Sequence, residues 1–133
     1  MRIMIDTNVL ISAFILSSQY LTEMIENIAE NHSIVMSTYI IDELKKVTSQ
    51  KFPDKYCFLE SFLNELPFEL IYTPDAIDQT KYPDIRDTKD LPILVSAITE
   101  DIDILITNNA DFAPLELGCP EILTPKAYVD KYC

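Results

Sequence analysis

Residues 2–14 read Arg-Ile-Met-Ile-Asp-Thr-Asn-Val-Leu-Ile-Ser-Ala-Phe, and this stretch decides the fold. Ile3, Met4 and Ile5 form a short apolar run that is typical of a buried strand, and Asp6 follows at once. A carboxylate at the edge of a hydrophobic core needs a partner, because desolvating it costs on the order of several kcal/mol. Asp6 therefore either caps a following helix or holds a metal ion, and the rest of the chain must decide between these interpretations.

The composition indicates one globular domain that spans residues 1–133, because 48% of the 133 residues are apolar. The sequence contains no apolar stretch long enough to cross a membrane, and its start lacks the pattern of a signal peptide, so we expect a cytoplasmic protein. Three cysteines without a CxxC pair and a single histidine argue against a disulfide framework, a zinc site and a Ser-His-Asp triad. The net charge of −12 indicates either a solvated acidic surface or an acidic cluster that a divalent cation neutralises.

Short apolar runs alternate with helical periodicity along the chain. Strands are expected at residues 2–5, 34–36, 68–73, 103–107 and 121–125. Helices are expected at residues 21–29, from a cap at Ser37 or Thr38 to about residue 47, at 55–66, at 91–98 and in a short last helix that Pro125 begins. Residues 74–89 are expected to form a loop. The single glycine excludes a phosphate-binding P-loop or GxGxxG site.

This alternation predicts an α/β fold whose parallel sheet is covered on both faces. Functional groups in such sheets gather beyond the carboxyl ends of the strands. Polar side chains stand at or one helical turn past these places: Asp6, Glu43, Asp90, Asn108, Asn109 and Asp111. Converging carboxylates repel one another unless protons or a cation lie between them, and hard oxygen ligands suit Mg²⁺ or Mn²⁺.

Four motifs in this order carry a family resemblance: "MIDTNVLIS" (4–12), "STYIIDELKKV" (37–47), "RDTKDLPILVSA" (86–97) and "LITNNADF" (105–112). Together they resemble a PIN domain, in particular the VapC-type toxin ribonucleases. The resemblance runs along essentially the whole chain. It implies a three-layer α/β/α sandwich with a central parallel sheet of four to five strands. It also implies an acidic endonuclease site that depends on Mg²⁺ or Mn²⁺.

The resemblance also assigns roles to individual side chains. Asp6, Glu43, Asp90 and Asp111 are the implied catalytic acids. Of these, Asp6, Asp90 and Asp111 would ligate the metal ion, and Glu43 would ligate it or orient a water molecule. The implied supporting residues, which would orient the acids and waters, are Thr7, Asn8, Thr107 and Asn109.

The fourth motif departs from the usual pattern. Many relatives have Thr-Gly-Asp-x-Asp-Phe, whereas residues 107–112 read Thr-Asn-Asn-Ala-Asp-Phe. Asn109 can bind a metal ion or a water molecule but brings no charge, so Asp111 is expected to supply the fourth carboxylate. The missing charge would weaken a second metal site more than the first.

Structural alternatives stand beside these roles. Asp42 competes with Glu43, because the choice depends on where their helix begins. Asp87 competes with Asp90 as a helix N-terminal acid, and Arg86 can pair with either. Asp6 alone fits a helix cap, and Asp111 alone fits the start of a turn.

The leading hypothesis is an endoribonuclease that cleaves single-stranded or loop RNA, with an antitoxin protein as inhibitory partner. The alternative is a PIN-fold binding or scaffold module with weak or no nuclease activity. A phosphatase of the aspartyl-phosphate type would need Asp-x-Asp after the first strand, where residues 6–8 read Asp-Thr-Asn. The sequence identifies neither the RNA target nor the metal ion, and it allows either a monomer or a homodimer.

Overall fold

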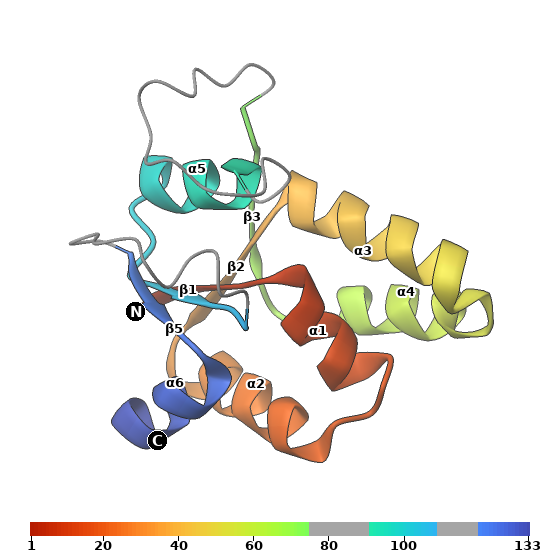
Figure 1. Ribbon diagram of the computed structural model, residues 1–133, viewed down its shortest axis with the longest axis horizontal. Coiled ribbons are helices and arrows are strands. Elements are labelled where there is room, and N and C mark those ends of the chain that lie inside the picture. The colour runs from red at the N-terminus through yellow and green to blue at the C-terminus, as the bar shows by residue number, and fades with distance from the viewer. Residues whose placement is uncertain (75–90, 109–119) are drawn as a thin grey trace.

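The structure of the protein, a computed structural model, describes residues 1–74, 91–108 and 120–133 (Figure 1). The strands are β1 (Arg2–Ile5), β2 (Ser33–Ser37), β3 (Glu69–Ile71), β4 (Ile104–Ile106) and β5 (Glu121–Leu123). The helices are α1 (Thr7–Phe14), α2 (Gln19–Asn31), α3 (Thr38–Lys51), α4 (Tyr56–Glu65), α5 (Leu91–Thr99) and α6 (Pro125–Tyr132), with a short 3-10 helix at Pro53–Lys55. The predicted loop at residues 74–89 lies almost entirely outside the described residues. None of the described helices has the length and apolar character that a membrane span requires.

The five strands form one parallel sheet in the order β3-β2-β1-β4-β5. The chain moves outward from β1 through β2 to β3, and it then returns to the other side of β1 with β4. The strand order therefore reverses at β1, and the carboxyl end of β1 faces the crevice where parallel sheets place their sites. Asp6 is the first residue after that strand.

Helices pack on both sides of the sheet, as the predicted α/β/α sandwich requires. Helix α5 lies on one side, and α2 and α6 lie on the other (Figure 1). Connections between parallel strands are right-handed, so the direction in which the chain moves along the sheet decides which face the connecting helix covers. The chain moves one way from β1 to β3 and the opposite way from β3 to β4, which puts α2 and α5 on opposite faces. The central strands are almost entirely inaccessible: Ile3, Met4, Ile104 and Leu105 are at most 1% exposed.

Residues 7–14 are the main difference between the sequence prediction and the structure. The predicted helices did not include one there, although the capping interpretation of Asp6 implied one, and these residues form α1 with Asp6 as its N-cap. Five of its eight residues are buried, since α1 packs against both α2 and α3. A helix that is apolar on most sides shows no amphipathic period, so the pattern of residues 9–11 resembles a strand as much as a helix.

The other helix ends follow the expected local chemistry. Ser37, one of two proposed caps, accepts a hydrogen bond from the Ile40 amide at 3.2 Å and begins α3. Pro125 occupies the first turn of α6, as predicted, and Thr124 caps that helix.

Candidate functional site

Asp6 lies at the junction of β1 and α1 and is buried, with 3% of its surface exposed. The Thr7 amide donates a hydrogen bond to Oδ1 at 2.7 Å, and the Thr107 hydroxyl donates one to Oδ2 at 2.7 Å. The backbone amide of Asp6 itself donates to the Ile106 carbonyl oxygen of β4 at 2.9 Å. Asp6 therefore caps a helix and also carries a fixed, buried carboxylate, so the two interpretations of this residue do not exclude each other.

The carboxyl group of Asp6 has a raised pKa. Burial is the largest cause, and the negative charge of Glu43 raises the pKa further, whereas the hydrogen bonds from Thr107 and Thr7 lower it. No lysine or arginine of the described residues is among the groups that shift this pKa. A buried carboxylate with a second acid nearby and no cationic side chain acting on it is an environment that a bound cation would stabilise.

Glu43 lies on α3 and is partly buried, whereas its neighbour Asp42 is exposed. The charge of Glu43, and not that of Asp42, acts on the pKa of Asp6. The start of α3 at Thr38 decides this difference, because successive helix residues point about 100° apart. Of the two competing acids, Glu43 is therefore the one whose charge reaches Asp6.

The predicted supporting residues lie around Asp6 in different ways. Thr107, directly after β4, is buried and donates to Asp6. Thr7 is buried too, and its hydroxyl has no hydrogen-bond partner in the described part of the chain. Asn8 is exposed on the first turn of α1.

Three predicted site residues, Asp90, Asn109 and Asp111, lie outside the described residues. Within residues 1–74, 91–108 and 120–133, no group of three or more acidic, histidine or cysteine side chains is placed to hold a metal ion. The described part of the site is thus Asp6, Glu43 and their hydrogen-bond partners. Helix α5 begins at Leu91, so Asp90 directly precedes a described helix.

A network of hydroxyl groups that sequence reasoning missed ties α5 to the same edge of the sheet. Thr73, just after β3, accepts a hydrogen bond from Ser96 of α5 at 3.1 Å and one from the Tyr39 amide at 3.3 Å. Its own amide donates to the Thr38 hydroxyl at 3.1 Å. These bonds fix the start of α3 against α5. The residues lie far apart in the sequence, and no local pattern marks them.

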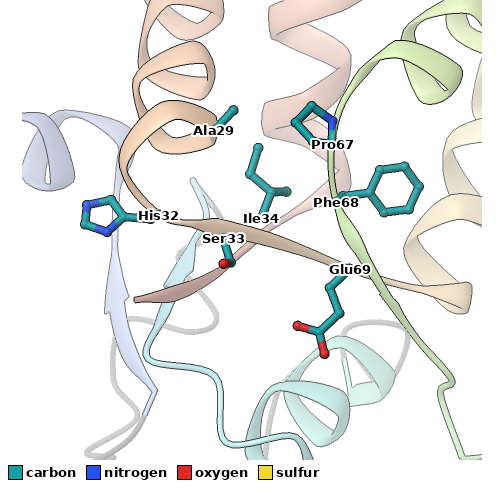
Figure 2. Close-up of a pocket in the computed structure, with 7 residues that line it drawn as sticks. All are labelled: Ala29, His32, Ser33, Ile34, Pro67, Phe68 and Glu69. Atoms are coloured by element: carbon teal, nitrogen blue, oxygen red, sulfur yellow. The ribbon is translucent and has the colours of Figure 1, made fainter.

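A groove runs between α2 and α4, on a different part of the surface. It consists of three adjoining hollows of about 380, 330 and 310 Å³, and neighbouring hollows share lining residues. Phe14 and Phe62 stack in it with ring centroids 3.5 Å apart. Figure 2 shows the last hollow, where Ala29 and Pro67 lie on either side of Ile34 of β2, whereas the rings of His32 and Phe68 point away from it. We call this surface the α2–α4 groove; its apolar and acidic lining includes Phe14, Glu23, Ile25, Glu26, Ala29, Glu30, Phe58, Phe62, Glu65, Leu66, Pro67 and Phe68.

Comparison with known proteins agrees with this architecture. A solved structure, VapBC2 from Rickettsia felis bound to a DNA fragment from their promoter, is similar with a TM-score of 0.69 and 22% sequence identity. The similarity covers 92% of this chain and 97% of that chain, and at this identity it shows the fold. A search of curated proteins finds no match. The family model of the PIN domain matches residues 2–111. This chain therefore belongs to the PIN domain family.

Proposed function

We propose that the protein is a metal-dependent endoribonuclease that cleaves single-stranded or loop RNA, and that it is the toxin of a toxin-antitoxin pair. One observation carries the proposal: a PIN domain places the buried carboxylate of Asp6 at the strand-order reversal, with the charge of Glu43 acting on it. Its two hydrogen bonds cap α1 and join it to Thr107, but no lysine or arginine of the described residues acts on its charge. The carboxylate is well placed to hold a cation against a phosphate.

The chemistry of the donor set fits Mg²⁺ or Mn²⁺. Asp6, Asp90 and Asp111 would hold the ion, because carboxylate oxygens are the ligands that these hard cations take. When bound, the ion would lower the pKa of a water molecule and offset negative charge on the phosphate. The pKa of Asp6 is raised mainly by burial and further by the charge of Glu43, and a bound cation would offset both effects.

The residues around Asp6 would position it. The Thr107 hydroxyl and the Thr7 amide each hold one carboxylate oxygen, which fixes the plane of the carboxyl group. Glu43 would ligate the ion or accept a proton from the attacking water. Its partial burial keeps its carboxylate beside the site rather than free in solvent.

The second candidate function is a binding or scaffold module with weak or no catalysis. Two observations favour it: Asn109 stands where many relatives have an acid, and the net charge of −12 repels RNA. Cleavage assays separate the two functions. We expect the purified protein to cleave a panel of single-stranded and hairpin RNAs in Mn²⁺ or Mg²⁺, and excess chelator to stop cleavage. Cleavage that persists in chelator would contradict the metal mechanism, and intact RNA across the panel would favour the scaffold.

The antitoxin is proposed to dock in the α2–α4 groove through a basic, amphipathic helix. The groove has an apolar floor around Phe14 and Phe62 and a rim of glutamates: Glu23, Glu26, Glu30 and Glu65. No lysine or arginine of the described residues lines its hollows. A helix with apolar residues on one face and arginines beside them would complement both features.

A synthetic helical peptide of leucine and arginine at this spacing is the probe for the groove. Phe58→Glu and Glu26→Lys should each weaken its binding about tenfold in fluorescence anisotropy, because the first disrupts the apolar contact and the second reverses a rim charge. Asp130→Lys, an equal charge reversal at an exposed position of α6, is the control. Equal losses in all three variants would mean that the peptide responds to net charge and not to the groove.

A further inference from the structure

We propose that Tyr39 and Lys46 of α3 form a subsite for the nucleotide next to the cleaved phosphodiester bond, an inference that rests on the proposed nuclease function. The subsite is a hollow of about 420 Å³ lined by Tyr39, Asp42, Glu43, Lys46 and Val47. Positions 39, 43 and 46 follow one another at helical steps of four and three residues, so these side chains share one face of α3. We call this hollow the α3 hollow.

Glu43 connects the α3 hollow to the candidate site. Its side chain lines the hollow, and its charge also acts on the pKa of Asp6. A strand of RNA whose phosphate lies at Asp6 would therefore extend along α3 past Glu43. Glu43 and Lys46 stand three residues apart on α3, so their side chains are neighbours on the helix surface, and a strand that passes Glu43 reaches Lys46 next.

Lys46 supplies a positive charge to the α3 hollow. Among the hollows described above, only the α3 hollow is lined by a lysine or arginine of the described residues. The Lys46 side chain is exposed, and its ammonium group forms no ion pair within the described residues, although Asp42 and Glu43 precede it by one turn. In a chain with 22 acids and 10 basic residues, an unpaired lysine beside the site is placed to contact a phosphate.

Tyr39 supplies a fixed aromatic surface at the other end of the α3 hollow. Its ring is partly buried against the core, and its amide is held by Thr73. An aromatic side chain already fixed by packing loses little entropy when a base stacks on it, and such stacking tolerates any base. The pair of a stacking ring and a phosphate-binding lysine is the usual arrangement in proteins that bind single strands.

Alternative roles for both residues predict different results. If Lys46 is only a solvated surface charge, Lys46→Ala and Lys45→Ala should have the same effect on RNA binding and cleavage. Lys45 is the matched position, because it is exposed on the same helix and does not line the hollow. If Tyr39 is only a packing residue, its loss lowers the melting temperature without a specific effect on RNA. Lys45→Ala and the melting temperature are therefore the matched controls.

The test combines steady-state cleavage with binding of a single-stranded RNA analogue, measured in metal-free buffer, where the proposed metal-dependent reaction cannot cleave it. Lys46→Ala should raise the KM for single-stranded RNA about fivefold, the effect of one exposed ion pair, and should leave kcat nearly unchanged. The slope of log(kcat/KM) against log salt concentration should become shallower by about 0.7, the loss of one phosphate contact. Tyr39→Leu should weaken analogue binding about tenfold, whereas Tyr39→Phe should not.

The two readouts separate this inference from the proposed function. Wild-type cleavage with identical KM values and salt slopes for Lys46→Ala and Lys45→Ala would overturn the subsite and leave the nuclease intact. Analogue binding that depends on Lys46 in a protein without cleavage would support the subsite and overturn the nuclease. A wild-type protein that neither binds the analogue nor cleaves RNA would overturn both.

Discussion

Asp6→Asn is expected to abolish RNA cleavage while the protein stays folded. The substitution keeps the size of the side chain and an oxygen that can accept the Thr7 amide, but it removes the charge that would hold the cation. We expect kcat/KM to fall more than about 100-fold, because mutating a residue that merely orients a metal ligand already lowers activity or metal affinity by about 10- to 100-fold. The measurement is cleavage of a labelled single-stranded RNA over a range of Mn²⁺ concentrations.

The same substitution should change how stability depends on pH. The pKa of Asp6 is raised above 3.8 in the folded protein, so the folded state binds this proton more tightly than the unfolded state does. In metal-free buffer, the wild type therefore gains stability as the pH falls through the raised pKa, and the gain is complete below the unfolded value of 3.8. Asp6→Asn lacks this gain, so the stability of the wild type relative to the variant should increase as the pH is lowered in urea unfolding experiments.

Two matched variants make the activity result specific. Asp130→Asn removes a charge from an exposed position of α6 that lines none of the hollows described above, and it should leave cleavage nearly unchanged. Thr107→Val removes the hydroxyl that donates to Asp6 but keeps the shape of the side chain, so it should weaken cleavage by about 10- to 100-fold and be partly rescued by more Mn²⁺. Cleavage by Asp6→Asn at the wild-type rate would show that Asp6 serves only as a helix cap.

Millimolar Mn²⁺ or Mg²⁺ is expected to raise the melting temperature well beyond the effect of NaCl at matched ionic strength. An ion that binds only the folded state stabilises it by about 2.7 kcal/mol at 100 times its dissociation constant. For a chain of this length, that free energy corresponds to a rise of about 8 °C. A scattered acidic surface would respond mainly to general screening, which NaCl also provides.

Variants of the proposed ligands locate the metal response. Asp90→Asn should leave the metal-free melting temperature unchanged or raise it, because it removes one repelling charge, and it should reduce the response to Mn²⁺. Asp6→Asn should reduce the response as well, whereas Asp130→Asn on α6 should not. If Mn²⁺ and NaCl stabilise the wild type equally and neither site variant alters this, the acids do not form a metal site.

The sheet and most helices were predictable because their signals are local. Apolar runs such as residues 3–5 and 104–106 mark buried parallel strands, and serine, threonine and proline mark helix starts. Helix α1 was missed because it is buried on most sides, so its apolar residues follow one another without an amphipathic period. The packing of α2 and α3 around this helix explains why so many of its residues are apolar, and residues 7–14 alone do not reveal that packing.

The candidate site was predictable only in part, for a similar reason. The place of Asp6 after a strand is a local fact, and so it pointed correctly to the edge of the sheet. The choice of Glu43 over Asp42 needed the first residue of α3, since an error of one position turns a side chain by about 100°. The contacts of Thr73 with α3 and α5 join residues 23 and more positions apart, and no sequence pattern indicates them.

The hydrogen bond from Thr107 to Asp6 joins residues that lie 101 positions apart. During synthesis, β1, β2 and β3 can pair while β4 has yet to leave the ribosome, because the first three strands are neighbours in the sheet. Throughout that interval, Asp6 lacks both the hydroxyl that holds its second oxygen and the backbone carbonyl of Ile106 that holds its amide. A nascent chain would thus carry its first acid in a loose, solvated form. If the protein is a ribonuclease, this delay would spare the messenger and the ribosome that are producing it.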